Sequence, residues 1–363
     1  MKKLQIQVLP YRLHFKQPAG TSRGILTTRK VWYVRISMPD DTYQPDEKKL
    51  LTELHELSTG CLSSVGWGEC APLPGLSCDD VPEYEEILTE ACHRMERSGE
   101  IPEELLTNFP SILFGLETAL QNLRAGENWK LWDSGFAQGE QGITTNGLVW
   151  MGTAEEMYKR IEEKTAAGFG CIKLKIGAIN FEQELFLLDF IRRNFTPKQI
   201  ELRVDANGAF TPEKAPEKLE RLAAFHLHSI EQPIRAGQWE AMAHLCRTSP
   251  LPIALDEELI GINERSRKIE LLETIRPQFI ILKPSLHGGI RGAEEWMNLA
   301  HERNIGSWVT SALESNIGLN AIAQWCATLQ PTMPQGLGTG MLFTDNVDSP
   351  LCMKGEKLWF NRK

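Results

Sequence analysis

The stretch IELRVDANGAF, residues 200–210, decides the fold. It is a short apolar run that ends at Asp205 and is followed by the turn formers Asn207 and Gly208. From about residue 144 onward such runs recur, each followed by a longer amphipathic stretch. The runs are NGLVW (146–150), CIKLK (171–175), IELRVD (200–205), HSIE (228–231), PIALD (252–256), FIILK (279–283), IGSWVTS (305–311) and GLGTG (336–340). Repeated units of this kind predict parallel strands with crossover helices, and about eight of them close into a (β/α) barrel.

An open, doubly wound sheet is the alternative architecture for such a repeat. The nucleotide-binding form of that sheet carries a glycine-rich phosphate-binding turn after its first strand. Here the first turn reads VWMGTAEE (149–156), which lacks that fingerprint. The barrel is therefore the better prediction.

The first 125 residues follow another pattern, which predicts a small α+β domain. Strand-like alternation in LQIQVLPYRLHF (4–15) and KVWYVRIS (30–37) gives way to helical patterns around residues 81–95 and 110–126. A charged insertion at residues 39–64 interrupts the strands. Its leucines, spaced as on one face of a helix, predict a short amphipathic helix added to the surface.

The composition narrows the class of function. The chain has 363 residues, 42% of them hydrophobic, and a net charge of -9 from 48 acidic and 39 basic residues. Such a charge gives no general attraction for nucleic acid or anionic lipid, and no apolar run is long enough to cross a bilayer. The eight cysteines form no zinc-binding pattern. We expect a cytoplasmic protein without nucleic-acid or membrane partners, whose aromatic surface residues are compatible with a homo-oligomer.

Charged side chains stand at the ends of five consecutive predicted strands. Their positions differ by 30, 26, 25 and 27 residues, one strand–helix unit each time. They are Lys175, Asp205, Glu231, Asp256 and Lys283. Because barrel chemistry is carried by the carboxyl ends of the strands, we expect these groups to lie around one rim. Lys173, two residues before Lys175, points to the same side of its strand.

Three carboxylates from neighbouring strands are suitable ligands for a hard divalent cation, and we expect Mg²⁺, with Mn²⁺ as the alternative. Such a cation polarises a substrate carboxylate and stabilises the negative charge that develops when an adjacent carbon loses a proton. The lysines would supply the acid and the base, since a like charge and partial burial both favour a neutral amine. A ring of salt bridges that binds no ligand is the alternative interpretation.

The same residues carry a resemblance to the muconate-lactonising subgroup of the enolase superfamily. It rests on KLK (173–175), VDAN (204–207), IEQP (230–233), LDE (255–257) and LKP (282–284). The resemblance implies a modified (β/α)₇β barrel over residues 126–340. It also implies a capping domain over 1–125 that contains GWGECAPLPGLS (66–77) and is completed by residues 341–363, where GEKLWF would return as a strand.

The resemblance also implies roles for these residues. The metal ligands would be Asp205, Glu231 and Asp256. Lys175 would be the base on one face of the substrate, and Lys283 would lie on the other face. Asn207 would support the metal shell or a water, although a turn-forming role explains it equally well.

Within the subgroup the chain is similar to the o-succinylbenzoate synthases of menaquinone biosynthesis. The similarity lies in QPAGTSRGIL (17–26), which resembles their active-site loop, and in TTNGLVWMG (144–152), LRVDANGAF (202–210) and SALESNIGLNAIAQW (311–325). It implies a hydro-lyase that removes water from 2-succinyl-6-hydroxy-2,4-cyclohexadiene-1-carboxylate to form 2-succinylbenzoate, through a metal-stabilised enediolate. The residues expected to contact this small carboxylate substrate are Lys173, Arg203, Ser311, Ser22 and Arg23.

Three alternatives share the barrel. Dipeptide epimerases tend to carry an Asp-x-Asp at the last strand, where this chain has Gly338-Thr339-Gly340. An N-acylamino acid racemase, or another enzyme of the muconate-lactonising type, fits the sequence more closely. A barrel that only binds a ligand is a more remote alternative, because it would be expected to lose some of the five rim residues, and all are present.

Overall fold

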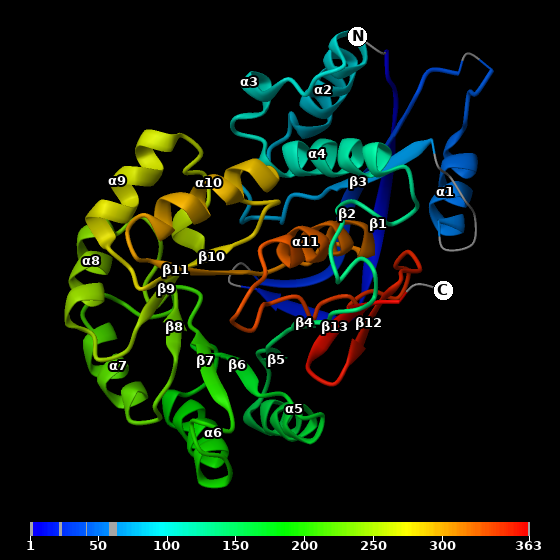
Figure 1. Cartoon of the computed structure of the whole chain (residues 1–363). Coiled ribbons are helices and arrows are strands. Elements are labelled where there is room, and N and C mark those ends of the chain that lie inside the picture. Colours follow the sequence, from blue (N-terminus) through cyan, green and yellow to red (C-terminus); the bar gives the residue numbers. More distant parts are fainter. Residues whose placement is uncertain (1–2, 22–23, 41, 58–63, 362–363) are drawn as a thin grey trace.

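The computed structural model describes residues 3–21, 24–40, 42–57 and 64–361, and it contains an antiparallel N-terminal sheet beside a parallel barrel (Figure 1). The N-terminal sheet has the order β1 (Gln5–Thr21), β2 (Gly24–Ser37), β3 (Val65–Cys70). Its helices are α2 (Tyr84–Ser98), α3 (Glu103–Leu106) and α4 (Pro110–Ala125). The expected α+β domain is present.

Close packing of β3 against α4 explains the glycines of the GWGEC motif. A Cβ on Gly66 would lie 2.0 Å from the carbonyl oxygen of Ala119, and one on Gly68 would lie 2.0 Å from that of Gly115. Only glycine permits this approach of backbone to backbone. The close contact fixes the strand that carries Glu69 between α4 and the barrel.

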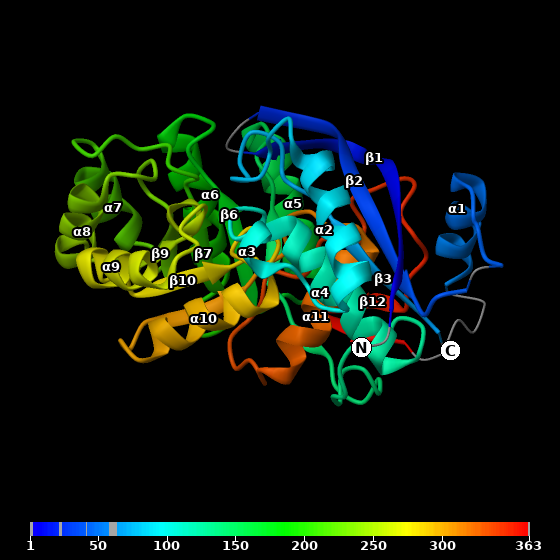
Figure 2. The same cartoon turned by 90° about the horizontal axis from the view of Figure 1, so that it is seen from above.

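The hairpin of β1 and β2 is long, and it extends from the capping domain to the barrel, as Figure 2 shows. Its register runs from Gln5 opposite Ser37 to Thr21 opposite Gly24, with an irregularity between His14 and Ala19. The expected helix of the insertion is α1 (Glu47–Glu56), whose buried Leu50 and Leu54 form its inner face.

The barrel is built from seven strands, each followed by a helix. The strands are β5 (Gly147–Val149), β6 (Cys171–Lys175), β7 (Glu201–Asp205), β8 (Ser229–Glu231), β9 (Ile253–Leu255), β10 (Phe279–Leu282) and β11 (Gly306–Val309). The helices are α5 (Ala154–Ala166), α6 (Phe181–Asn194), α7 (Ala215–Ala223), α8 (Trp239–Thr248), α9 (Arg265–Ile275), α10 (Gly289–His301) and α11 (Asn316–Thr328), with a short 3-10 helix η1 (Glu257–Leu259) after β9. All neighbouring strands of this sheet are parallel.

An eighth, very short strand segment closes the ring. Gln335 bridges Thr145 before β5, and Gly336 bridges Thr310 after β11, both in parallel. No helix follows this segment among the described residues before the C-terminal hairpin. The fold is thus the expected modified (β/α)₇β barrel rather than an open sheet.

The C-terminal hairpin corrects one expectation. GEKLWF does form a strand, β13 (Lys357–Phe360), but it pairs with β12 (Leu351–Lys354) and with β4 (Ile143–Thr144) in a third sheet. It does not pair with β1, β2 or β3. The segment before this hairpin contacts β1, through the bridge between Phe343 and Phe15 and a hydrogen bond from the Thr344 N–H to the His14 carbonyl oxygen. The proposed domain boundary after residue 125 stays a prediction, and α4 ends at this point.

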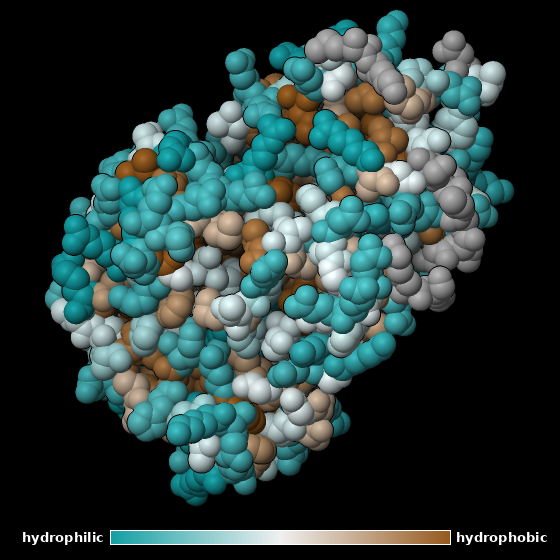
Figure 3. Space-filling model, in the orientation of Figure 1, coloured by the Kyte–Doolittle hydropathy of each residue, from teal (hydrophilic) through white to brown (hydrophobic). Residues whose placement is uncertain are grey.

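The surface in Figure 3 is mainly hydrophilic, with apolar residues scattered over it. No helix among the described residues combines the length and the apolar character needed to span a bilayer. The seven described cysteines are all free thiols.

Candidate active site

Parallel register brings the charged strand ends together. Lys175 is paired with Asp205, and Asp205 with Glu231, across β6, β7 and β8. Asp256 follows β9 and Lys283 follows β10, the next two strands of the same sheet. Four of these five residues, all except Glu231, line one pocket at this end of the barrel, together with Lys173. The predicted rim is therefore present in the structure.

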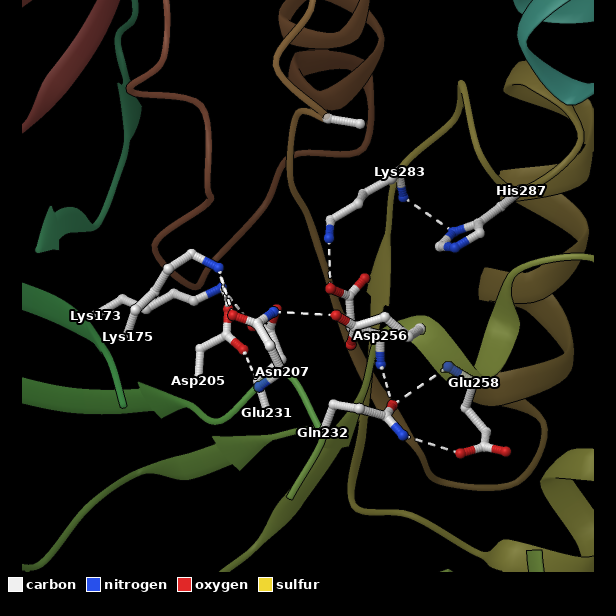
Figure 4. Close-up of polar contacts among 12 residues, drawn as sticks. Lys173, Lys175, Asp205, Asn207, Glu231, Gln232, Asp256, Glu258, Lys283 and His287 are labelled. Carbon is white, nitrogen blue, oxygen red and sulfur yellow. Dashed lines mark hydrogen bonds and ion pairs between the residues drawn. The ribbon is translucent and has the colours of Figure 1, made fainter. Parts of the chain in front are cut away.

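Each acid of the rim is paired with a lysine (Figure 4). The Nζ atom of Lys173 lies 2.6 Å from Glu231 Oε2 and 3.0 Å from Asp205 Oδ2. Lys175 Nζ lies 3.1 Å from Asp205 Oδ2. Lys283 approaches from the other side of the pocket, with Nζ 2.5 Å from Asp256 Oδ2.

Burial makes these charges depend on one another. Desolvation opposes ionisation of Asp205, but Lys173 and Lys175 outweigh it and hold the pKa of Asp205 well below its usual range. Burial and then the charge of Asp205 raise the pKa of Glu231. Desolvation likewise opposes the charge of Lys283, yet the acids around it, Asp256 first, raise its pKa. The lysines thus serve as counter-ions of the acids.

The acids fit a divalent cation by their chemistry. They supply hard oxygen donors from three adjacent strands, and the buried atoms Glu231 Oε1 and Asp256 Oδ1 have no hydrogen-bond partner. However, no group of three or more His, Cys, Asp or Glu side chains in the described part of the chain stands ready to hold a metal ion. Because every acid is bonded to an ammonium group, a cation would have to take over contacts that the lysines now make.

A chain of hydrogen bonds links Lys175 to Glu257, an acid of the LDE motif to which the sequence assigned no role. Lys175 Nζ donates to Asn207 Oδ1 at 2.8 Å, and Asn207 Nδ2 donates to Glu257 Oε1 at 3.0 Å. Burial and then the charge of Asp256 raise the pKa of Glu257 to about 7. The alternation of side chains along a strand predicts that Glu257, which directly follows Asp256, points away from the rim. The sequence pattern therefore gave no reason to place it in the site. The start of η1 turns it back toward the pocket.

The remaining wall of the pocket is largely apolar. Leu73 and Leu76 from the capping domain and Leu148, Trp150 and Leu313 from the barrel line it.

The predicted substrate contacts have different positions in the structure. Ser311 lines the pocket and shares a hydrogen bond of 2.6 Å with Thr339. Arg203 does not line it, because its guanidinium donates to Glu201 and to the carbonyl of Pro334. Ser22 and Arg23 lie outside the described residues, although the nearby Gly20 lines the pocket. A substrate contact at Ser311, Arg203, Ser22 or Arg23 stays a prediction.

Comparison with known proteins gives two family matches along the chain. Residues 156–354 match the enolase C-terminal domain-like family, and residues 50–123 match the MenC N-terminal domain. The first match alone covers more than half of the chain.

Individual relatives agree with these matches. The chain is 48% identical to o-succinylbenzoate synthase of Desulfotalea psychrophila, over 96% of this chain and 97% of the relative. The crystal structure of MenC from the same organism has a TM-score of 0.81 at 42% identity, covering 98% of this chain and 99% of the other. L-Ala-D/L-Glu epimerase of Bacillus subtilis is 24% identical over 73% of this chain and 74% of the relative. The chain therefore belongs to the o-succinylbenzoate synthase family within the enolase superfamily.

Proposed function

We propose that this protein is a hydro-lyase that converts 2-succinyl-6-hydroxy-2,4-cyclohexadiene-1-carboxylate into 2-succinylbenzoate, a step of menaquinone biosynthesis. The single observation that carries the proposal is the pair of lysines, Lys175 and Lys283, that approach one pocket from opposite sides next to three acids (Figure 4). The 48% identity to a synthase along nearly the whole chain supports the choice of substrate.

Lys175 is the proposed base. Its amine takes the proton from the ring carbon that bears the carboxylate, and the C–O bond to the hydroxyl group then breaks. The departing oxygen receives that proton and leaves as water, and the electron pair of the broken C–H bond completes the aromatic ring. Asn207 accepts a hydrogen bond from Lys175 at 2.8 Å and so orients the amine.

Lys283 is proposed to act as a fixed cation on the opposite face. Its Nζ atom is held by Asp256, whose charge raises the pKa of the lysine against the desolvation that burial imposes. A lysine that stays protonated attracts the substrate carboxylate but does not take a proton. This division of roles suits a dehydration that needs one base.

We propose Mg²⁺ as the cofactor, with Asp205, Glu231 and Asp256 as its ligands. The family uses a divalent metal, and oxygen donors from three strands suit Mg²⁺, with Mn²⁺ as the alternative. When bound, the cation supplies positive charge next to the substrate carboxylate as the adjacent carbon loses its proton. The carboxylate oxygens without partners, Glu231 Oε1 and Asp256 Oδ1, support this ligand set.

The pocket wall argues against the dipeptide epimerase alternative. Such enzymes tend to use two carboxylates at the last strand, whereas this wall carries Gly338 and Thr339, and the Thr339 hydroxyl is bonded to Ser311. Since a negative charge for a substrate amine is missing from this part of the described wall, an anionic substrate is the better match. The apolar surface of Trp150 and Leu148 suits a flat ring.

The direct experiment mixes purified protein, Mg²⁺ and the cyclohexadiene substrate and follows the absorbance of the aromatic product. We expect rapid formation of 2-succinylbenzoate, and none with Lys175→Ala. If the parent forms no product but interconverts the enantiomers of an N-acylamino acid, the protein is a racemase and the proposal is wrong.

The cellular context is proposed from the charge and composition of the chain. A net charge of -9 is unsuited to nucleic acid or anionic membranes, so we propose a cytoplasmic enzyme that acts on a small carboxylate. A homo-oligomer is compatible with this role, and light scattering of the purified protein measures the oligomeric state.

A further inference from the structure

Leu313 has an unusual backbone conformation at the pocket wall. Its φ angle is 63°, in the left-handed region that favours glycine. The residue is buried and lines the pocket beside Ser311 and Ala312. A left-handed conformation at a non-glycine residue costs free energy and persists only where the surroundings impose it. The groups that bind the chain before and after Leu313 should therefore impose this conformation.

Two charged residues of the N-terminal domain bind the chain on either side of Leu313. On one side, Arg29 of β2 donates from Nη1 to the carbonyl oxygen of Ala312. On the other side, Glu69 of β3 accepts from the Ser315 backbone N–H at 2.9 Å and from the Ser315 hydroxyl at 2.5 Å. Glu69 also accepts from the N–H of Gly318 at 2.9 Å, in the first turn of α11.

A third group, Glu314 of the barrel, also binds the segment around Leu313. Glu314 accepts from the Ala312 backbone N–H at 2.7 Å and from the Ser285 hydroxyl at 2.5 Å. Ser285 stands two residues after Lys283, so the same carboxylate links the Leu313 segment to the strand end that carries the proposed cation. Both Glu69 and Glu314 are fully buried.

Arg29 joins this segment to the part of the pocket wall that the capping domain supplies. While Nη1 binds Ala312, Nη2 donates to the carbonyl oxygen of Ala71 at 2.6 Å. Ala71 begins the loop that supplies Leu73 to the pocket, and Arg29 itself has no exposed surface. One rigid guanidinium therefore sets the spacing between an apolar wall of the capping domain and an apolar wall of the barrel.

We propose that Arg29 and Glu69 are positioning residues, which hold Leu313 in its left-handed conformation and so complete the apolar wall against which the substrate ring packs. They do not touch the acids or the lysines of the rim. The pocket acquires its shape only when the capping domain is bound to the barrel through these two residues. The expected effect on substrate affinity rests on the function proposed above.

The first test compares Arg29→Met with Arg35→Met. Arg35 is the matched control, because it is another buried arginine on the same strand. Its side chain binds Glu53 and Gln7 of the N-terminal domain, and it does not line the pocket. Arg29→Met should raise the KM for the cyclohexadiene by about tenfold or more, the loss expected for one charge-assisted hydrogen bond. Its Mg²⁺ affinity should stay within about twofold of the parent, and Arg35→Met should keep the parental KM.

A second readout is independent of any substrate. Hydrogen exchange measured by mass spectrometry should be faster in Arg29→Met than in the parent for peptides that cover residues 311–318, and unchanged there in Arg35→Met. Glu69→Gln should have the same local effect, because its amide cannot accept all three hydrogen bonds. If Arg29→Met does not fold, Glu69→Gln tests the proposal by the same measurement.

The outcomes separate the two proposals. If the parent does not dehydrate the cyclohexadiene, the proposed function fails, and the exchange of residues 311–318 still decides whether Arg29 and Glu69 hold this segment. If the parent is active but folded Arg29→Met keeps its KM or its local exchange, the positioning role is refuted. An equal rise in KM in Arg35→Met would refute it as well, because the effect would then be general destabilisation.

Discussion

Replacing Lys173 by Met is the most informative single perturbation of the rim. In the parent, the Lys173 ammonium contacts Glu231 Oε2 at 2.6 Å and Asp205 Oδ2 at 3.0 Å, and its side chain is only 8% exposed. The substitution preserves most of the apolar stem and removes the charge. Two buried carboxylates are then left next to each other, with only Lys175 remaining on Asp205.

The expected loss of stability follows from this geometry. Removing one partner of a buried ion pair costs about 3–5 kcal/mol, because the other charge stays desolvated. Burial and Asp205 already raise the pKa of Glu231, so this acid can take up a proton and lose its charge in the variant. The loss of stability should therefore be near the lower end of that range. A domain of this size loses about 2–4 °C of Tm per kcal/mol, so a loss of about 3 kcal/mol should lower the Tm of metal-free Lys173→Met by roughly 6–12 °C relative to the parent.

Divalent cations should reverse much of this loss. If the ammonium of Lys173 competes with a cation for the acids, its removal makes the acids better ligands. A cation at a hundredfold excess over its Kd stabilises the folded state by about 2.7 kcal/mol. The Mg²⁺-dependent rise in Tm should therefore be larger in Lys173→Met than in the parent.

The assay is thermal denaturation of each protein after chelation and again with excess Mg²⁺. Lys30→Met is the matched control, because Lys30 forms a solvent-exposed pair with Glu85 and should change stability by about 1 kcal/mol or less. An equal Mg²⁺ response in the parent and in Lys173→Met would refute the competition between lysine and metal. A variant as stable as the parent without metal would refute the counter-ion role of Lys173.

Three further predictions concern proton transfer, metal and pH. Lys175→Arg should abolish dehydration, whereas Lys283→Arg should form product faster than Lys283→Ala, since arginine keeps the charge but holds its proton; equal rates for the two Lys283 variants would contradict a purely cationic role. Exhaustive chelation should stop product formation and Mg²⁺ should restore it, so full activity of metal-free protein would rule out the proposed cofactor. Burial raises the pKa of Glu117 to about 8 from an ordinary 4.5. Its proton therefore stabilises the fold below about pH 4.5, and this contribution is lost as the pH rises through 8. Glu117→Gln should flatten the decline in Tm between about pH 5 and 8.5, and a decline as steep as the parent's would contradict the raised pKa.

The sequence was sufficient to predict the barrel and its rim because both depend on periodicity. A spacing of one strand–helix unit places Lys175, Asp205, Glu231, Asp256 and Lys283 on successive strands, and parallel register then aligns their ends. No comparable periodicity in the sequence predicts which strand the C-terminal strand pairs with. The alternation of GEKLWF predicts a strand, but nothing local distinguishes pairing with β4 from pairing with the N-terminal sheet.

The sequence pattern also could not predict in which direction a long side chain inside the barrel extends. Lys173 and Arg203 are paired across β6 and β7, so they start from the same layer, one below the rim. Lys173 extends up to Glu231 and Asp205, whereas Arg203 turns to the carbonyl of Pro334. Long side chains can point either way from one layer, and the available partners decide. For Lys173 those partners are the acids themselves.

The charges of the rim explain why three lysines accompany three acids. As ions, Asp205, Glu231 and Asp256 carry three negative charges, and Lys173, Lys175 and Lys283 carry three positive ones, so the buried cluster is neutral before anything binds. A divalent cation alone would leave two positive charges in excess. Release of the Lys175 proton, which makes its amine the proposed base, removes one of them, and the proposed substrate brings two carboxylates, one on the ring and one on the succinyl chain. Metal and substrate should therefore each favour the binding of the other, and by the same factor. On this argument the lysines are counter-ions of the acids until the cation replaces them, and they then become available to the substrate.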